Sequence, residues 1–190
     1  MIIQKLKVLR NSVRNRTLLR RHGVEYAARP VINGRLFISG EGKISFGKDV
    51  VVNSSPSANP TGVGTRTHFY AAPGAKISVG DGTGLSNCVI AAFESVTIGK
   101  NVLIGTDVKI YDTDFHSLDY DERIADDKDA VKAKPVEIGD GAFICTGAII
   151  LKGVHVGEKA VVGAGSVVSR DVPAGEVWAG NPAAFVKKLY

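Results

Sequence analysis

The sequence predicts an all-β chain wound into a parallel solenoid, and three features of its 190 residues indicate this fold. Branched aliphatic residues outnumber leucine, with 24 Val and 15 Ile against 10 Leu, a balance that favours strands over helices. The 22 glycines supply many turns. In addition, Val and Ile recur every six residues over much of the chain. Because 44% of the residues are apolar, one domain with a sizeable core is expected.

The first element expected is a basic N-terminal helical segment over residues 1–30. Residues 1–21 hold seven Lys and Arg and no acid, whereas the rest of the chain has 17 basic and 19 acidic residues. Apolar residues follow a helical spacing from Ile2 to Val13. The helix could pack on the domain with a solvated basic face, or dock on an anionic membrane or on a phosphorylated or lipid-linked substrate. Nucleic-acid binding is not expected, because the segment has no aromatic residue to stack on a base.

The solenoid is predicted over residues 31–178. Each hexad suits one short strand and a turn, and three hexads per coil predict a triangular prism whose branched side chains stack from coil to coil. Positions four residues further on in each hexad are small or β-branched. The strong repeat positions are Ile98, Ile104, Ile110, Ile138, Ile144, Ile150, Val156, Val162 and Val168. Weaker echoes stand at Ile38, Ile44, Val50, Val79 and Leu85.

Two excursions are expected to interrupt the coils. Residues 53–76 break the phase and contain Asn-Pro and Ser-Pro turn sequences. Between Ile110 and Ile138 the spacing is not a whole number of hexads, so residues 111–137 form an inserted segment. Solenoids commonly place such insertions on the binding face, which makes this segment the first place to look for chemistry.

The second excursion holds nine acidic residues, four basic residues and one histidine, His116. An imidazole suits the removal of a proton from a hydroxyl or amine that attacks a thioester, and a carboxylate on its other ring nitrogen would orient it. Asp114 and Asp119 are the nearest carboxylates in the sequence. A solvated acidic loop with an incidental His116 is one alternative. A metal site from Asp112, Asp114 and His116 is another.

The six-residue repeat, strong over residues 98–173, resembles that of the hexapeptide-repeat acyltransferases. The motifs in and after the second excursion are similar to the sugar O-acetyltransferase branch of that family, which includes maltose, galactoside and capsule- or polysaccharide-modifying enzymes. The motifs are Asp114-Phe115-His116-Ser117, Arg123, Lys134-Pro135 and Ile138-Gly139-Asp140. The resemblance implies a left-handed parallel β-helix, and a general base at His116 with Asp114 or Asp119 to orient it. It also implies direct transfer without an acyl-enzyme, and Asn87 and Arg123 as acceptor-binding residues.

By the same resemblance, the donor is acetyl-CoA, which lies along the last coils between two subunits of a homotrimer, and no metal is needed. The expected donor contacts are Thr146, Gly147, Ala164, Ser169, Arg170, Lys187 and Lys188. Residues 179–190 are expected to form a C-terminal capping helix, because Asn181-Pro182 is a sound helix start. The loop at 53–70 does not match the small-sugar enzymes, which leaves the acceptor open among free, nucleotide-linked and lipid-linked sugars.

Two competing functions remain open on the sequence alone. One is N-acetylation of an amino sugar nucleotide, which a histidine base would serve equally well. The other is a non-catalytic β-helix used for assembly. Cys88 and Cys145 form no disulfide framework and no Cys-x-x-Cys pair, which favours a cytoplasmic setting. No stretch reads as a signal peptide or a membrane span, so contact with the inner membrane face would be peripheral.

Overall fold

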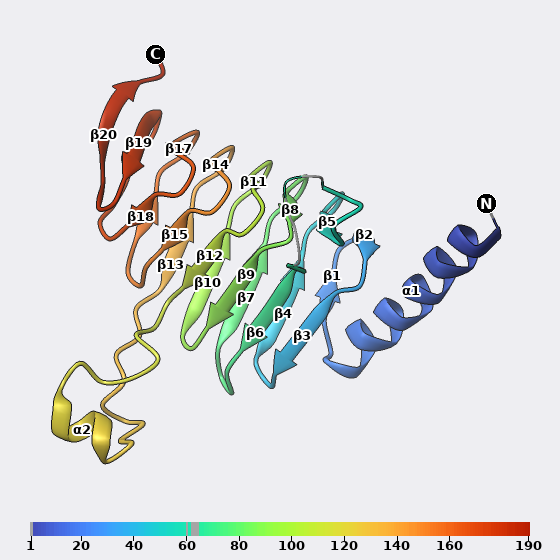
Figure 1. Ribbon diagram of the computed structural model, residues 1–190, viewed down its shortest axis with the longest axis horizontal. Coiled ribbons are helices and arrows are strands. Elements are labelled where there is room, and N and C mark those ends of the chain that lie inside the picture. Colours follow the sequence, from blue (N-terminus) through green and yellow to red (C-terminus); the bar gives the residue numbers. More distant parts are fainter. Residues whose placement is uncertain (1, 60, 62–64) are drawn as a thin grey trace.

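The computed structural model describes residues 2–59, 61 and 65–190, and only the backbone of residues 2–7. A long N-terminal helix, α1 (Ile2–Arg21), leads into a column of stacked coils (Figure 1). Each coil contributes one short strand to each of three sheets, so the triangular prism predicted from the repeat is confirmed. The fold is the left-handed parallel β-helix that the resemblance implies.

The three sheets form the three sides of the prism, and strands of consecutive coils pair in parallel within each. Sheet A contains β1 (Glu25–Tyr26), β4 (Lys43–Phe46), β7 (Lys76–Val79), β10 (Ser95–Ile98), β13 (Val136–Ile138) and β16 (His155–Val156). Sheet B contains β2 (Val31–Gly34), β5 (Val51–Ser54), β8 (Gly84–Ser86), β11 (Leu103–Ile104), β14 (Phe143–Ile144), β17 (Val161–Val162), β19 (Glu176–Gly180) and β20 (Ala183–Lys188). Sheet C contains β3 (Phe37–Gly40), β6 (His68–Ala71), β9 (Val89–Ala92), β12 (Lys109–Tyr111), β15 (Ile149–Ile150) and β18 (Val167–Val168).

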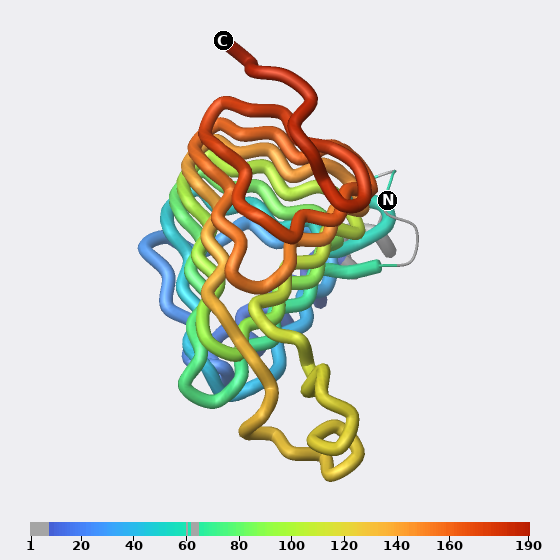
Figure 2. The backbone as a smooth tube through the Cα atoms, turned by 90° about the vertical axis from the view of Figure 1, so that its left-hand side faces the viewer, coloured from blue at the N-terminus to red at the C-terminus, as the bar shows by residue number. Residues whose placement is uncertain are grey.

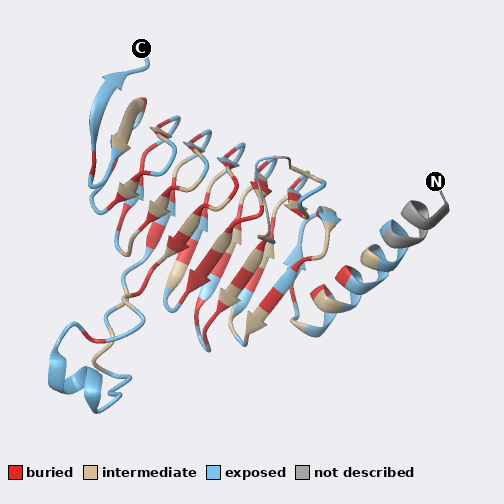
Figure 3. Ribbon diagram, in the orientation of Figure 1, coloured by how far each residue is buried: buried red, intermediate tan, exposed pale blue. Residues whose placement is uncertain are grey.

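The core of the prism consists of the repeat positions (Figure 3). All nine strong Val and Ile positions are at most 3% exposed, and the small or β-branched positions four residues later are at most 2% exposed. Full burial of a Val or Ile side chain stabilises a fold by roughly 1.5–3 kcal/mol. The repeat is therefore the principal source of stability, and the five weaker echo positions are buried with it.

The early coils are longer than the later ones, which explains why the repeat is weak before residue 98. Glu137 pairs with His155, one coil of 18 residues later, whereas Val89 pairs with Lys109, 20 residues later. The first excursion is also shorter than the predicted 53–76, because β5 continues to Ser54 and β6 starts at His68. Phe69 fills the core position that Val or Ile fills elsewhere, so the six-residue pattern does not reveal β6.

The solenoid starts at residue 25, before the predicted boundary at 31, because β1 already pairs with β4. Helix α1 packs on this first coil through Asn15 and Leu19, which are 3% and 2% exposed. The side chains of Ile2 and Leu6, part of the predicted apolar spacing, lie outside the described residues, whereas Val13 is exposed. Among the described residues, no helix has both the length and the apolar character needed to cross a membrane.

The C-terminal segment is a β-hairpin, and the predicted capping helix over residues 179–190 is wrong. β19 joins sheet B parallel to β17, and β20 returns antiparallel beside it. Asn181 and Pro182 lie in the turn, after Gly180 with a φ of 102°, a conformation that glycine adopts readily. A helix would have left the edge of β19 unpaired, whereas β20 covers it. Valine and aromatic residues in the segment also favour strands.

Candidate active site

Two excursions leave the prism at different corners. Residues 55–67 connect a strand of sheet B to one of sheet C, a position that we call the B/C corner. Residues 112–135 connect sheet C to sheet A, at the C/A corner, and contain the short helix α2 (Tyr120–Ile124). Viewed nearly along the coil axis, this second excursion projects well beyond the prism (Figure 2).

Asp112 links the start of the second excursion to the turn at Phe93 and Glu94 in the preceding coil. It is fully buried, and its two carboxylate oxygens accept hydrogen bonds from the backbone nitrogens of Phe93 and Glu94, each at 2.7 Å. Burial raises the pKa of Asp112, and the backbone donors act in the opposite direction. These oxygens face protein donors, so they are not available to a metal ion together with Asp114 and His116. The described residues contain no cluster of three metal-ligating side chains.

Asp114 and Asp119 do not orient His116 in this structure. Asp114 forms an ion pair with Lys152 at 2.6 Å, which ties the excursion to the following coil. Asp119 is the N-cap of α2, where its Oδ1 accepts from the backbone nitrogens of Asp121 and Glu122. Each side chain therefore has another partner in this structure, and the assignment of either one as the orienting carboxylate stays a prediction.

His116 is exposed near the start of the excursion, where the chain turns sharply. Phe115 before it has a φ of 63°, and Ser117 after it is 7% exposed and donates to Glu122 Oε2. No hydrogen bond to a described residue is found for the His116 ring. The pKa of the exposed Asp126 is lowered, chiefly by its hydrogen bond and ion pair with Lys128.

Arg123 has a structural role that differs from the predicted acceptor contact. One terminal nitrogen of its guanidinium donates to the carbonyl oxygens of Ser117, Leu118 and Asp119 at 2.9, 3.0 and 3.2 Å. These bonds hold the turn that follows His116. A cavity of about 360 Å³ lies beside this turn, lined by Asp114, Ser117, Leu118, Asp119, Glu122, Asp129, Ala130 and Lys132.

Asn87 lies at the B/C corner, not beside His116. It is 1% exposed and has a φ of 44°, and its Oδ1 has no hydrogen-bond partner among the described residues. An amide oxygen that is buried without a partner costs about 1–3 kcal/mol, so a ligand hydroxyl donating to it would be stabilising. The first excursion covers this residue, since Asn87 Nδ2 donates to the carbonyl oxygen of Ser55 at 3.4 Å.

The expected donor residues divide between the two corners. Thr146, Gly147 and Ala164 lie at the B/C corner in the coils that follow Asn87. Ser169 and Arg170 lie at the C/A corner, and Lys187 and Lys188 lie on β20. All are exposed except Gly147, which is partly buried. One chain therefore presents half of the expected site at each of two corners.

Sequence reasoning missed two features of these corners. Thr106 is fully buried at the B/C corner, and its Oγ1 contacts Thr61 Oγ1 at 2.8 Å and Thr146 Oγ1 at 3.4 Å. At the C/A corner, four rings form an aromatic cluster with centroid distances of 5.1–5.7 Å. The aromatic cluster consists of Tyr70, Phe93, Tyr111 and Phe115. Only Tyr111 and Phe115 stand near His116 in the sequence, and the irregular early coils hid the others.

Comparisons with known proteins agree with this fold. A family model described as bacterial transferase hexapeptide (six repeats) matches residues 135–170. A hexapeptide-repeat-containing acetyltransferase of Vibrio cholerae is 32% identical over 70% of this chain and 78% of its own, with a TM-score of 0.56. In its complex with acetyl-CoA, the match has 35% identity over 65% of each chain and a TM-score of 0.58.

Two further acetyltransferases are similar to this chain. A maltose O-acetyltransferase of Clostridium difficile is 25% identical over 98% of this chain and 84% of its own, with a TM-score of 0.62. A candidate acetyltransferase of Dictyostelium discoideum is 46% identical over 94 residues, or 50% of this chain. The chain spans about half of that protein, 47% of its length.

Proposed function

The chain belongs to the hexapeptide-repeat acetyltransferases, and on this premise we propose that it transfers an acetyl group from acetyl-CoA to a hydroxyl group of a sugar. The complex of the Vibrio cholerae relative with acetyl-CoA supports the donor. The Clostridium difficile relative, which is a maltose O-acetyltransferase, supports the acceptor class. Both relatives share the β-helix on which the two corners of this chain are built.

His116 acts as the general base in this proposal. The neutral imidazole accepts the proton of the acceptor hydroxyl as its oxygen attacks the thioester carbonyl. The carbon–sulfur bond then breaks, the proton passes to the leaving thiolate, and the products are an acetyl ester and coenzyme A. No acyl-enzyme forms. The observation that carries the proposal is that His116 lies exposed on an excursion whose turn is fixed by Ser117 and Arg123.

The donor is assigned to the B/C corner. Thr146, Gly147 and Ala164 are small, so the pantetheine arm can approach the backbone there. Ser169 and Arg170 at the C/A corner of the neighbouring subunit, together with Lys187 and Lys188 on β20, supply hydrogen-bond donors and positive charge for the phosphate groups of the same acetyl-CoA. The unpartnered Oδ1 of Asn87 accepts a hydrogen bond from a hydroxyl group of the acceptor sugar.

The complete site requires a homotrimer, because His116 and Asn87 lie at different corners of one chain. In a three-fold assembly, the projecting excursion of one subunit reaches the B/C corner of the next. Each interface between two subunits then brings His116 of one subunit next to the acetyl-CoA site at the B/C corner of the other. A single chain would leave both halves incomplete.

The acceptor is a sugar unit in the synthesis of a polysaccharide or glycolipid. The aromatic cluster beside His116 offers flat apolar faces, and Phe93 and Phe115 are 37% and 40% exposed. Aromatic rings bind the apolar face of a sugar while the hydroxyl groups stay free for hydrogen bonds. The reaction is placed in the cytoplasm, where acetyl-CoA is available, with residues 1–21 as a peripheral contact to the inner membrane face.

The test is release of the coenzyme A thiol from acetyl-CoA in the presence of a panel of sugars and amino sugars. We expect turnover with at least one sugar, and a loss of about 10²–10⁴-fold in the His116→Ala variant. His22→Ala is the matched control, because His22 lies at the far end of the molecule, after α1. Unchanged turnover in His116→Ala would remove His116 as the base, and turnover with amino groups alone would contradict O-acetylation.

A further inference from the structure

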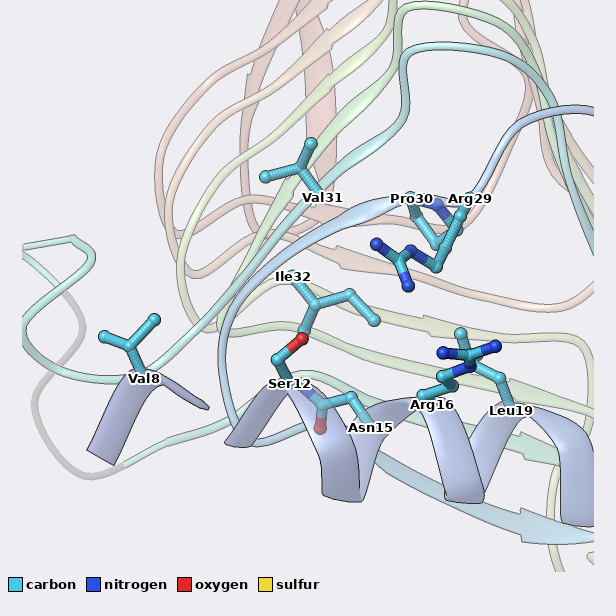
Figure 4. Close-up of a pocket in the computed structure, with 9 residues that line it drawn as sticks. All are labelled: Val8, Ser12, Asn15, Arg16, Leu19, Arg29, Pro30, Val31 and Ile32. Atoms are coloured by element: carbon cyan, nitrogen blue, oxygen red, sulfur yellow. The ribbon is translucent and has the colours of Figure 1, made fainter. Parts of the chain in front are cut away.

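A cleft lies between α1 and the first coil (Figure 4). Its volume is about 270 Å³, and its walls come from α1, from the segment that leads into β2 and from the first residues of β2. The lining residues are Val8, Ser12, Asn15, Arg16, Leu19, Arg29, Pro30, Val31 and Ile32. Asn15 joins the two walls of the cleft, since its Nδ2 donates to the carbonyl oxygen of Gly34 and its Oδ1 accepts from Leu36 N.

The cleft carries an uncompensated positive charge. Arg16 on α1 and Arg29 before β2 both place their guanidinium groups in the space between helix and coil (Figure 4). Its lining contains no acidic residue, and neither guanidinium forms an ion pair or hydrogen bond with a described residue. Two guanidinium groups that approach from different elements are a favourable arrangement for a phosphate group, which arginine binds through paired donors.

The remaining walls are mostly apolar, and this favours anionic ligands that also have an apolar part. Val8, Leu19, Pro30, Val31 and Ile32 supply most of the other lining. A free phosphate would gain nothing from these walls, whereas an amphiphile would bury its apolar chain against them. The ligand that fits both parts has an anionic head and a hydrocarbon body.

The surface beside the cleft suits a lipid bilayer. Leu9 and Val13 are 62% and 59% exposed, and by helical periodicity they share a face with Arg16 and Arg20. Exposed apolar residues flanked by arginines are typical of helices that lie in the interface of an anionic membrane. Residues 1–21 contain no acid that would oppose this contact.

We propose that the cleft between α1 and the first coil binds the phosphate headgroup of an anionic membrane lipid through Arg16 and Arg29. The headgroup lies between the two guanidinium groups, and the start of the lipid chain contacts the apolar walls. Leu9 and Val13 enter the surrounding bilayer surface. This inference rests on the membrane contact proposed above and not on the acetyl transfer, so the two can fail separately.

The experiment is co-sedimentation of the full chain with vesicles of phosphatidylcholine, alone or with 30 mol% phosphatidylglycerol (a composition of about one third anionic lipid). Wild-type protein is expected to bind only the anionic vesicles. The double variant Arg16→Gln/Arg29→Gln should bind at least about tenfold more weakly. The matched control is Arg14→Gln/Arg21→Gln, which removes the same charge from the opposite face of α1, and it should lose less than about threefold.

Each other outcome overturns the inference. An equal loss in both double variants would mean that total charge, not the cleft, attracts the membrane. Equal binding to both vesicle types would exclude phosphate recognition. A third outcome is that the protein binds neither type of vesicle and instead self-associates in a way that Arg16→Gln/Arg29→Gln abolishes. That result would assign the cleft to a second copy of the chain. The His116→Ala variant should bind vesicles like the wild type. Vesicle binding can therefore be measured even if the protein shows no acetyl transfer.

Discussion

Cys88 lies in the core of the prism, and burial raises the pKa of its thiol to about 12. The thiolate is the reactive form, so this residue has almost no nucleophilic character at neutral pH. We therefore expect Cys88→Ala to keep wild-type acetyl transfer. In the native protein at pH 8, a thiol reagent should label the partly buried Cys145 slowly, since burial raises the pKa of that thiol as well, and should leave Cys88 unlabelled.

Mass spectrometry of the labelled protein checks this prediction. Cys88 should react only after unfolding, or as the pH approaches 12. An acetylated Cys88 trapped during turnover would contradict direct transfer, because it would show a covalent intermediate on this thiol.

At the residue scale, His116 could be predicted from the sequence but its surroundings could not. It is the single histidine in a segment that interrupts a regular repeat, and both features can be recognised from the sequence alone. Asp114, Asp119 and Arg123 are close in sequence, yet each turns to a backbone group or to Lys152. Which polar side chain faces which depends on how the excursion folds, and no periodicity describes that.

At the element scale, the contact of α1 with the first coil depends on one buried amide. Asn15→Ala removes both hydrogen bonds to the turn at Gly34 and Leu36, and leaves buried backbone groups without partners. We expect a loss of about 1–3 kcal/mol in the stability of this contact. Thr17→Ala is the control, because the Thr17 hydroxyl is exposed and only bonds back to Val13 within the helix.

Hydrogen exchange measures this effect directly, because undocking exposes the amides of α1 and of the first coil while the later coils stay protected. Faster exchange confined to that end is expected for Asn15→Ala. If exchange were equal in the two variants, Asn15 would not be the residue that holds the helix in place.

The elements that the sequence predicts best are those with the strictest repeat. From Ile138 to Val168 each coil has 18 residues, and every strand follows from counting. β6 was missed because Phe69 stands in the core position and the preceding excursion shifts the count. The C-terminal hairpin was missed because Asn-Pro serves both helix starts and turns, and the open edge of sheet B decides between them.

At the scale of the whole molecule, the candidate site residues lie at two separate corners of the prism. His116 and the aromatic cluster lie at the C/A corner, whereas Asn87 and Thr146 lie at the B/C corner. A repeat of six residues, counted three to a coil, predicts the number of corners but not how far an excursion projects from one of them. The second excursion projects well beyond the prism (Figure 2), and the proposed trimer rests on that projection.

Mixed trimers of two inactive variants test this account most directly. His116→Ala removes the base, and Thr146→Trp fills the donor groove with a bulky side chain at an exposed position. Both should assemble but be inactive alone. In the proposed trimer each site takes its base and its groove from different subunits, so random mixed trimers should recover about a quarter of the sites, measured as coenzyme A release. Mixed trimers that form but remain inactive would place the whole site within one chain and contradict the account.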